Sequence, residues 1–469
     1  MNSKKVKLIA CAALAVLVLF MIFTLVKNIK DKKAFEENML LGSEYMKRLE
    51  YEKAFEAYKT AAEINNDEEA YRLAAAACEG FSDYENAIKY YKKSIKYDKN
   101  DINIKSYEGL AELYILQGEN DEAAKLTEKA VKKSENSETA QLYERFHPKA
   151  PQPDYEQGEY SERIRVAFTA GEGEKIYITS DGTEPQEIDL YTAPVILKNG
   201  TTQIKVKAVN DRGYESETVS YTYTINIEDK VIEFDDKGIE AAVRKQLSVS
   251  DNEPVYNDDA AGITKLVLVS DTEMAVNAGF TDNSDYYAGE VKTLTDLKNL
   301  PFIEELNIIG IKNCDITSIS LARSLKYLSL RYMDLEDVSA LSGLVNLEKL
   351  CLADNNISNI FPVGNLTGLS SLGIWNNNIS DISPLSGLVN LKYFDISKND
   401  VKDISIIANM PELKELWLYD NNVRDISAIL ELKEIRIIMA RNNPIIDLGI
   451  FEDIYPRLER CDIELDIAE

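Results

Sequence analysis

The chain has 469 residues and a formal net charge of −27 at pH 7, and its length predicts three or four domains, because single hydrophobic cores rarely exceed about 250–300 residues. Residues 147–469 hold most of the acidity, with 55 Asp and Glu against 30 Lys and Arg. A surface this negative repels phosphate backbones, which argues against nucleic acid as a partner.

The first predicted element is an N-terminal membrane anchor within residues 1–34. Residues 8–26 form an uncharged run of 19 residues, which is long enough to cross a bilayer as a helix. The run ends in a basic stretch and lacks the small-residue cleavage site of a signal peptide, so we expect an uncleaved single-pass anchor. Lysines flank it on both sides, and the positive-inside rule therefore leaves the orientation open.

Residues 35–146 repeat a helical pattern every 33 to 36 residues, a period typical of helix-turn-helix solenoids. Three stretches, which begin at Gly42, Ala75 and Ala111, superpose position by position. Their small residues let paired helices approach each other, while aromatic residues fill the space between repeats. Three such units are enough for a stable stack.

These stretches resemble tetratricopeptide repeats, a family whose concave groove often binds peptides. The positions of the family's carboxylate-clamp asparagine are occupied here by Ser43, Ala76 and Glu112, so that function is not carried over. Two expectations remain open for residues 35–146. They form either a spacer or self-association arm, or a peptide-binding surface.

A proline-rich stretch, residues 147–154, predicts a linker. It contains His147, the only histidine of the chain, which we expect to be an ordinary exposed residue. Residues 155–227 then change period. Apolar and polar residues alternate as in half-buried strands, and the turn signals Asp181-Gly182 and Asn199-Gly200 separate them.

The stretch from Tyr177 through Pro185 and Pro194 to Val209 resembles the immunoglobulin-like C-terminal domain of chitobiase and hexosaminidase enzymes. In that family the module is an accessory domain, and the catalytic residues lie in another domain. The resemblance therefore implies a small β-sandwich in an extracellular setting and assigns no glycosidase activity.

The strongest pattern lies in residues 263–469. Seven segments are spaced 22 residues apart and begin at Ile303, Leu325, Leu347, Leu369, Leu391, Leu413 and Ile435. The apolar positions predict a solenoid with a continuous core. Asparagine recurs once in each coil, where its buried amide can bond backbone groups of the adjacent coil, at Asn355, Asn377, Asn399, Asn421 and Asn443.

This block resembles the leucine-rich repeats of internalins, which are bacterial surface adhesins. Residues 228–262 resemble the helical N-terminal cap of that family, and a cap is physically required to cover the first coil. An insertion at about residues 271–290 interrupts the first coil and carries exposed aromatic residues. Its role stays open, although a contact element is one expectation.

The inner, concave face of the repeats is the candidate binding site, because side chains between the buried leucines point outward there. Trp, Tyr and Arg dominate interface hot spots, and both tryptophans of the chain fall on this face. The alternative is that these rings only pack on each other. The candidate ligand-binding residues are Tyr327, Arg331, Tyr332, Trp375, Tyr393, Asp395, Trp417, Tyr419, Asp420 and Arg441.

The cysteines are too scattered to indicate a metal knuckle or redox pair, and we expect no catalytic residue, cofactor or metal. Asp and Asn residues on the convex turns are assigned to turn chemistry. The expected fold class is multidomain α plus β: a transmembrane helix, a tetratricopeptide-like solenoid, a β-sandwich and a capped leucine-rich-repeat horseshoe.

The expected function is adhesion: a non-enzymatic protein on a Gram-positive-type cell surface, with the bulk of the chain outside, recognises a protein ligand. A glycan ligand, an intracellular scaffold and, less favoured, a glycoside hydrolase with paired carboxylates are the alternatives.

Overall fold

The structure, a computed structural model, describes residues 3–98, 103–134, 136–280, 286–449, 452 and 454–463, with side chains described from residue 17 onward except at residue 18. It divides into two compact units. The first comprises Met1–Gln157, Val166–Pro194 and Thr202–Thr222, and the second comprises Gly158–Arg165, Val195–Thr201 and Tyr223–Glu469. Each unit contains its own hydrophobic core.

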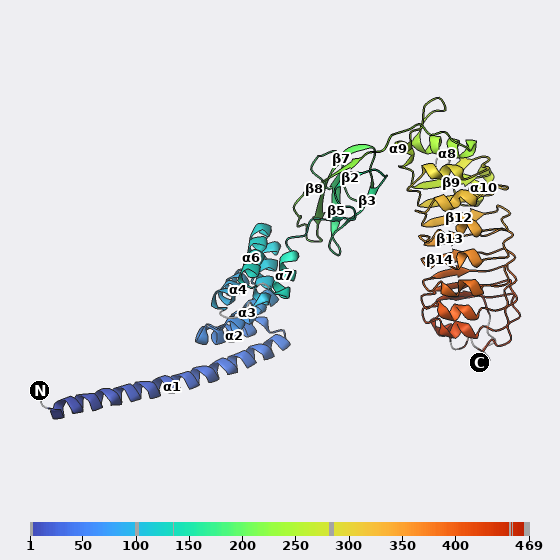
Figure 1. Cartoon of the computed structure of the whole chain (residues 1–469). Coiled ribbons are helices and arrows are strands. Elements are labelled where there is room, and N and C mark those ends of the chain that lie inside the picture. Colours follow the sequence, from blue (N-terminus) through green and yellow to red (C-terminus); the bar gives the residue numbers. More distant parts are fainter. Residues whose placement is uncertain are drawn as a thin grey trace. The chain divides into compact units, whose positions relative to one another are not determined.

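The first unit begins with one long helix, α1 (Ser3–Lys47) (Figure 1). It runs without a break across the expected boundary between the anchor and the repeats at residues 34 and 35. Most side chains of the predicted membrane span, residues 8–16 and 18, lie outside the described residues. Within the described residues, no helix contains a stretch long and apolar enough to cross a bilayer. The anchor therefore stays a prediction.

Consecutive helices of the repeats pack on each other. After α1 they are α2 (Tyr51–Asn65), α3 (Glu68–Gly80), α4 (Tyr84–Tyr97), α5 (Ile104–Leu116), α6 (Asn120–Lys133) and α7 (Ser137–Glu144). Ala54, Ala87 and Ala123, at equivalent positions of the three repeats, are completely buried. At Gly42 a Cβ atom would lie 2.7 Å from the Tyr58 ring, so only glycine permits this close approach of α1 and α2. Small residues thus set the helix spacing, as the sequence predicts.

The β domain contains a four-stranded sheet in the order β2-β8-β7-β5 and two short two-stranded sheets, β1-β4 and β3-β6. Its strands are β1 (Gln152–Pro153), β2 (Gly158–Tyr160), β3 (Arg165–Val166), β4 (Phe168–Thr169), β5 (Lys175–Thr179), β6 (Val195–Ile196), β7 (Gly200–Val209) and β8 (Val219–Ile225).

The linker expected at residues 147–154 includes a short edge strand, because Gln152 and Pro153 pair with β4 at a place where a missing amide donor is tolerated. One expectation for this stretch is wrong. His147 is half-buried instead of exposed. Its ring stacks on Tyr143 with 4.1 Å between centroids. The two residues are four positions apart, so their side chains lie on the same side of the helix end.

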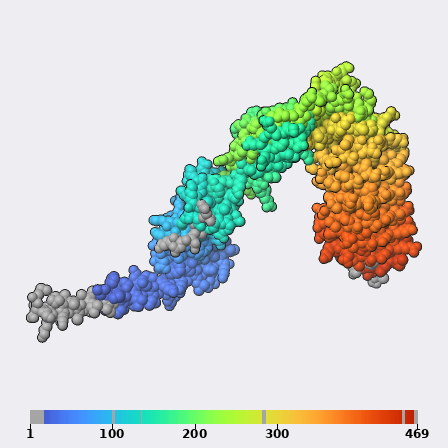
Figure 2. Space-filling view, viewed as in Figure 1, coloured from blue at the N-terminus to red at the C-terminus, as the bar shows by residue number. Residues whose placement is uncertain are grey.

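The second unit is dominated by a ten-stranded parallel sheet in the order β10-β9-β11 through β18. Its strands are β9 (Lys265–Val269), β10 (Tyr287–Ala288), β11 (Glu305–Ile309), β12 (Tyr327–Arg331), β13 (Lys349–Cys351), β14 (Ser371–Gly373), β15 (Tyr393–Asp395), β16 (Glu415–Trp417), β17 (Ile437–Met439) and β18 (Arg460–Cys461). The coils stack in chain order, from yellow to red in Figure 2. Helices α8 (Lys237–Leu247) and α9 (Asn257–Ala260) lie at the first coils, where Figure 1 shows them beside β9.

The 22-residue period keeps every strand in register with its neighbours, so Leu350, Leu372 and Phe394 occupy one buried row. On the opposite side of the coils a row of 3-10 helices begins after recurrent aspartates. Asp381 Oδ1, for example, accepts a hydrogen bond from the Ser383 amide at 2.8 Å. Asp403 and Asp425 accept the equivalent bonds from Ser405 and Ser427, so these aspartates form the turns that lead into the helices. No cluster of potential metal ligands occurs within the described residues.

The recurrent asparagines join consecutive coils, which confirms the role predicted from their spacing. Asn377 Nδ2 donates to the carbonyl of Leu352 in the preceding coil at 3.0 Å, and its Oδ1 accepts the Ile357 amide at 3.0 Å. Asn399 repeats this pattern one coil later, with Ile374 and Ile379 as its partners. The buried backbone groups at these turns are therefore satisfied by side chains.

Candidate functional site on the strand face

The strand face is the outward face of the parallel sheet, which the sequence predicts to be concave. Register pairs Ser329, Cys351, Gly373, Asp395 and Trp417 in one row across the strands. A second row, two residues further along each coil, consists of Arg331, Ala353, Trp375, Ser397, Tyr419 and Arg441. The ten candidate residues lie in these rows or beside them, and none of them belongs to the hydrophobic core of the repeats.

Arg331 holds an aromatic cluster together at the β12 end of this face. Its guanidinium carbon lies 5.3 Å from the ring centroids of both Tyr332 and Trp375, and a nitrogen lies 3.8 Å from a carboxylate oxygen of Asp354. The intervening residue of the row is the small, buried Ala353, which allows Arg331 and Trp375 to meet across it. Cation–π contacts of this kind fix the ring orientation before any ligand arrives.

The Trp375 ring packs closely against the backbone of β14 at Gly373, where a larger residue would not leave space for it. A Cβ atom at Gly373 would stand 2.6 Å from Cζ3 of the Trp375 ring. The ring is half-buried and turns one surface to solvent. Gly373 therefore positions this tryptophan, although it makes no polar contact itself.

A second aromatic cluster lies toward the C-terminal end. The rings of Trp417 and Tyr419 meet edge to face with 6.5 Å between centroids. Arg460 lies over Trp417 at 5.6 Å and Arg441 lies over Tyr419 at 4.9 Å. Trp417 is half-buried, and its indole nitrogen is a donor without a hydrogen-bond partner among the described residues.

Asp395 lies between the two clusters and is only 6% exposed. Its Oδ1 accepts the Ser397 amide at 2.9 Å, and its Oδ2 accepts the Tyr393 hydroxyl at 3.3 Å. Burial raises the pKa of the Asp395 carboxyl, and burial together with this carboxylate raises the pKa of the Tyr393 hydroxyl. Tyr393 therefore remains a hydrogen-bond donor at neutral pH.

Two further candidates, Tyr327 and Asp420, lie outside the two aromatic clusters. Tyr327 is half-buried on β12, where burial raises the pKa of its hydroxyl. Asp420, at a left-handed turn position with φ of 56°, accepts a hydrogen bond from Asn442 Nδ2 at 2.6 Å. This bond joins adjacent coils, which gives Asp420 a structural role.

The strand face also uses residues that the sequence reasoning did not select: Ala353, Asp354, Gly373, Ser397 and Arg460. The 22-residue spacing could have flagged Ala353, because it places a small residue next to Trp375 in the row. Gly373 could have been flagged from local sequence, because it precedes Trp375 by two residues and therefore lies on the same face of the strand. Arg460 lies beyond the last regular repeat, and no spacing signal points to it.

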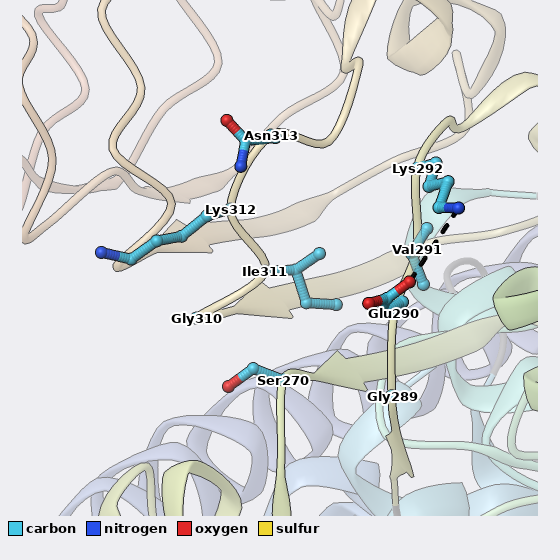
Figure 3. Close-up of a pocket in the computed structure, with 9 residues that line it drawn as sticks. All are labelled: Ser270, Gly289, Glu290, Val291, Lys292, Gly310, Ile311, Lys312 and Asn313. Carbon is cyan, nitrogen blue, oxygen red and sulfur yellow. Dashed lines mark ion pairs between the residues drawn. The ribbon is translucent and has the colours of Figure 1, made fainter.

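A separate cavity of about 430 Å³ lies at the first coils, next to the insertion (Figure 3). The insertion contributes helix α10 (Thr272–Asn277) and strand β10, which pairs with β9. Ile311 and Val291 face each other from two sides of the cavity. Its lysines already have acidic partners: Lys312 pairs with Asp334 at 2.9 Å and Lys292 with Glu290 at 4.0 Å.

Three family models match separate segments of the chain. They are the tetratricopeptide repeat over residues 80–145, the chitobiase/beta-hexosaminidase C-terminal domain over residues 155–222, and paired leucine-rich repeats over residues 345–387, 367–409 and 389–433. A comparison with curated proteins gives no match. The three matches confirm the resemblances drawn from the sequence.

Among similar solved structures are three internalins of Listeria monocytogenes. Internalin C2 is 26% identical, with 47% of this chain and 90% of that chain covered and a TM-score of 0.42. The internalin inlF is 19% identical, with 50% and 96% covered and a TM-score of 0.35. The functional domain of InlJ is 17% identical, with 51% and 64% covered and a TM-score of 0.33. The chain thus joins segments similar to tetratricopeptide repeats, a chitobiase/beta-hexosaminidase C-terminal domain and leucine-rich repeats.

Proposed function

We propose that this chain is a non-enzymatic surface protein, anchored in a membrane by residues 8–26, that binds a protein ligand through its strand face. The observation that carries the proposal is the pair of half-buried tryptophans, Trp375 and Trp417, which stay outside the repeat core on a face between two arginine clusters. Rings already fixed by cation–π contacts lose little conformational freedom on binding, which favours affinity.

A glycan is the second candidate ligand, because aromatic rings also stack on sugars and the chain carries a chitobiase-type accessory domain. Residues 35–146 serve in this proposal as an arm that sets the reach of the repeats. A peptide ligand or self-association of this arm would be an additional function.

Binding is tested with the Trp375→Ala/Trp417→Ala double variant of the full chain on intact target cells. We expect affinity to fall by at least about 30-fold, which corresponds to one lost hot-spot side chain. The matched control is Phe361→Ala/Tyr455→Ala, which removes two exposed aromatic rings from the 3-10 helices. Equal binding by wild type and the tryptophan variant would refute the proposal, as would equal losses in both double variants.

The chemical class of ligand follows from treating the same cells with protease or with glycosidases before binding. Loss after protease alone supports a protein ligand, and loss after glycosidase alone supports the glycan. Anchoring is tested separately. Deletion of residues 1–26 is expected to move the chain from the membrane fraction to the soluble fraction, and protease shaving of intact producer cells is expected to remove the repeats.

A further inference from the structure

We propose that Asp395 receives a lysine side chain of the protein ligand, which reaches the carboxylate between Trp375 and Trp417. This proposal rests on the proposed function and names the chemistry of its central contact. The three residues lie on neighbouring strands or directly after them, so their arrangement is fixed by the sheet register rather than by a mobile loop.

The register places Asp395 between the two aromatic rings. Its partner on β14 is Gly373, over which the Trp375 ring lies, and its partner on β16 is Trp417 itself. Adjacent strands are about 4.8 Å apart, so the strands that lead into the two tryptophans lie directly on either side of the strand that carries Asp395. A cation that approaches Asp395 therefore meets the two rings as well, and aromatic faces attract cations.

The Asp395 carboxylate retains capacity for a donor. A carboxylate has about four lone-pair sites, and the Ser397 amide and the Tyr393 hydroxyl occupy two of them. In the described part of the chain, the influences on the Asp395 pKa are burial and hydrogen bonds, and no basic side chain is among them. A ligand cation would therefore supply the missing countercharge.

The three arginines of the same face lie at other contacts. Arg331 contacts Asp354, Tyr332 and Trp375, and Arg441 lies over Tyr419 and 3.8 Å from Asp462. Arg460 is exposed and lies over the Trp417 ring at 5.6 Å. The charged residue on the strand next to Asp395 is Glu415 of β16, which adds negative potential. The middle of the strand face is thus complementary to a positive group.

The recessed position of Asp395 favours lysine over arginine. Its side chain is nearly buried, so a ligand group has to be slim to reach it. Lysine carries a compact ammonium with three donors on a flexible apolar stem, which can lie along the ring edges. The arginine guanidinium is a wide planar fork, better suited to an exposed carboxylate that presents both oxygens.

The test uses small probes on the full chain, and its readout is selective because the chain contains only two tryptophans, both beside Asp395. Nα-acetyl-lysine methylamide is titrated while tryptophan fluorescence is followed. We expect a saturable change in about the millimolar range, as befits one contact. The uncharged analogue Nα-acetyl-norleucine methylamide is expected to give no saturable change.

Asp395→Asn is expected to weaken lysine binding at least tenfold, and Asp381→Asn, at an exposed turn before a 3-10 helix, is expected to leave it unchanged. If Asp395→Asn fails to fold, the lysine and norleucine probes on the wild-type chain still decide the matter. The proposal is overturned if both probes behave alike, if Asp395→Asn binds normally, or if the corresponding arginine probe binds as tightly as lysine.

A parallel titration with chitotriose distinguishes failure of this proposal from failure of the proposed function. Saturable binding of this sugar without a response to the lysine probe would overturn the lysine proposal in favour of a glycan subsite. If no probe changes the fluorescence but the tryptophan double variant loses cell binding, the proposed role of Asp395 is overturned and the proposed function stands.

Discussion

Replacement of Asn377 by alanine is expected to destabilise the repeats, because it leaves one buried backbone N–H group without an acceptor. Asn377 contacts four backbone groups, which are three carbonyls and one N–H. Each carbonyl keeps another donor in the variant: Asn355 for Leu352, Asn399 for Ile374, and the Asp354 amide for Trp375. The Ile357 N–H has Asn377 Oδ1 as its acceptor and is left without one in the variant. One buried unsatisfied donor together with the lost hydrogen bonds costs about 2–4 kcal/mol.

The matched control is Asn443→Ala in the last regular coil. Asn443 makes the same contacts, including acceptance of the Val423 amide at 2.9 Å, but it is half-buried. Water can therefore replace its hydrogen bonds, and we expect a cost of about 0.5–1 kcal/mol. Urea unfolding followed by tryptophan fluorescence measures both variants. Equal costs, or a cost below about 1 kcal/mol for Asn377→Ala, would refute this account of the asparagine row.

Gly373→Ala is expected to push the Trp375 ring off β14, because the new Cβ would stand 2.6 Å from it, with a loss of about 1–2 kcal/mol. An unchanged emission spectrum of Trp375 in a Trp417→Phe background would contradict this. Burial raises the pKa of Asp395, so the folded state binds its proton more tightly than the unfolded state does. The contribution of Asp395 to stability therefore declines as pH rises from the ordinary Asp pKa of about 3.9 to the higher folded value. Asp395→Asn is expected to remove this decline, which is measured as the unfolding midpoint at a series of pH values. Arg163→Ala breaks a largely buried ion pair with Asp258 and is expected to lower the free energy of unfolding by about 3–5 kcal/mol. The loss is measured as faster amide exchange in residues 158–165, and unchanged exchange would show that this ion pair does not stabilise the segment.

The sequence alone determined the architecture of the repeats, because a fixed 22-residue period imposes one register on every coil. Residues 22 positions apart must then be neighbours, which made the roles of Asn377 and Asp381 predictable from spacing. It also placed Trp375 and Trp417 outside the core, since alternate strand residues point to opposite faces.

Tertiary structure decided how deep each side chain lies on that face, because depth depends on the size of its neighbours in the same row. The Trp375 ring packs close to β14 because Gly373 has no side chain, and Arg331 reaches the ring across the small Ala353. Asp395, expected at the surface as a ligand contact, is nearly buried, in a row between Gly373 and Trp417. Its position and the number of its hydrogen bonds depend on side chains from three strands, and no single stretch of sequence contains that information.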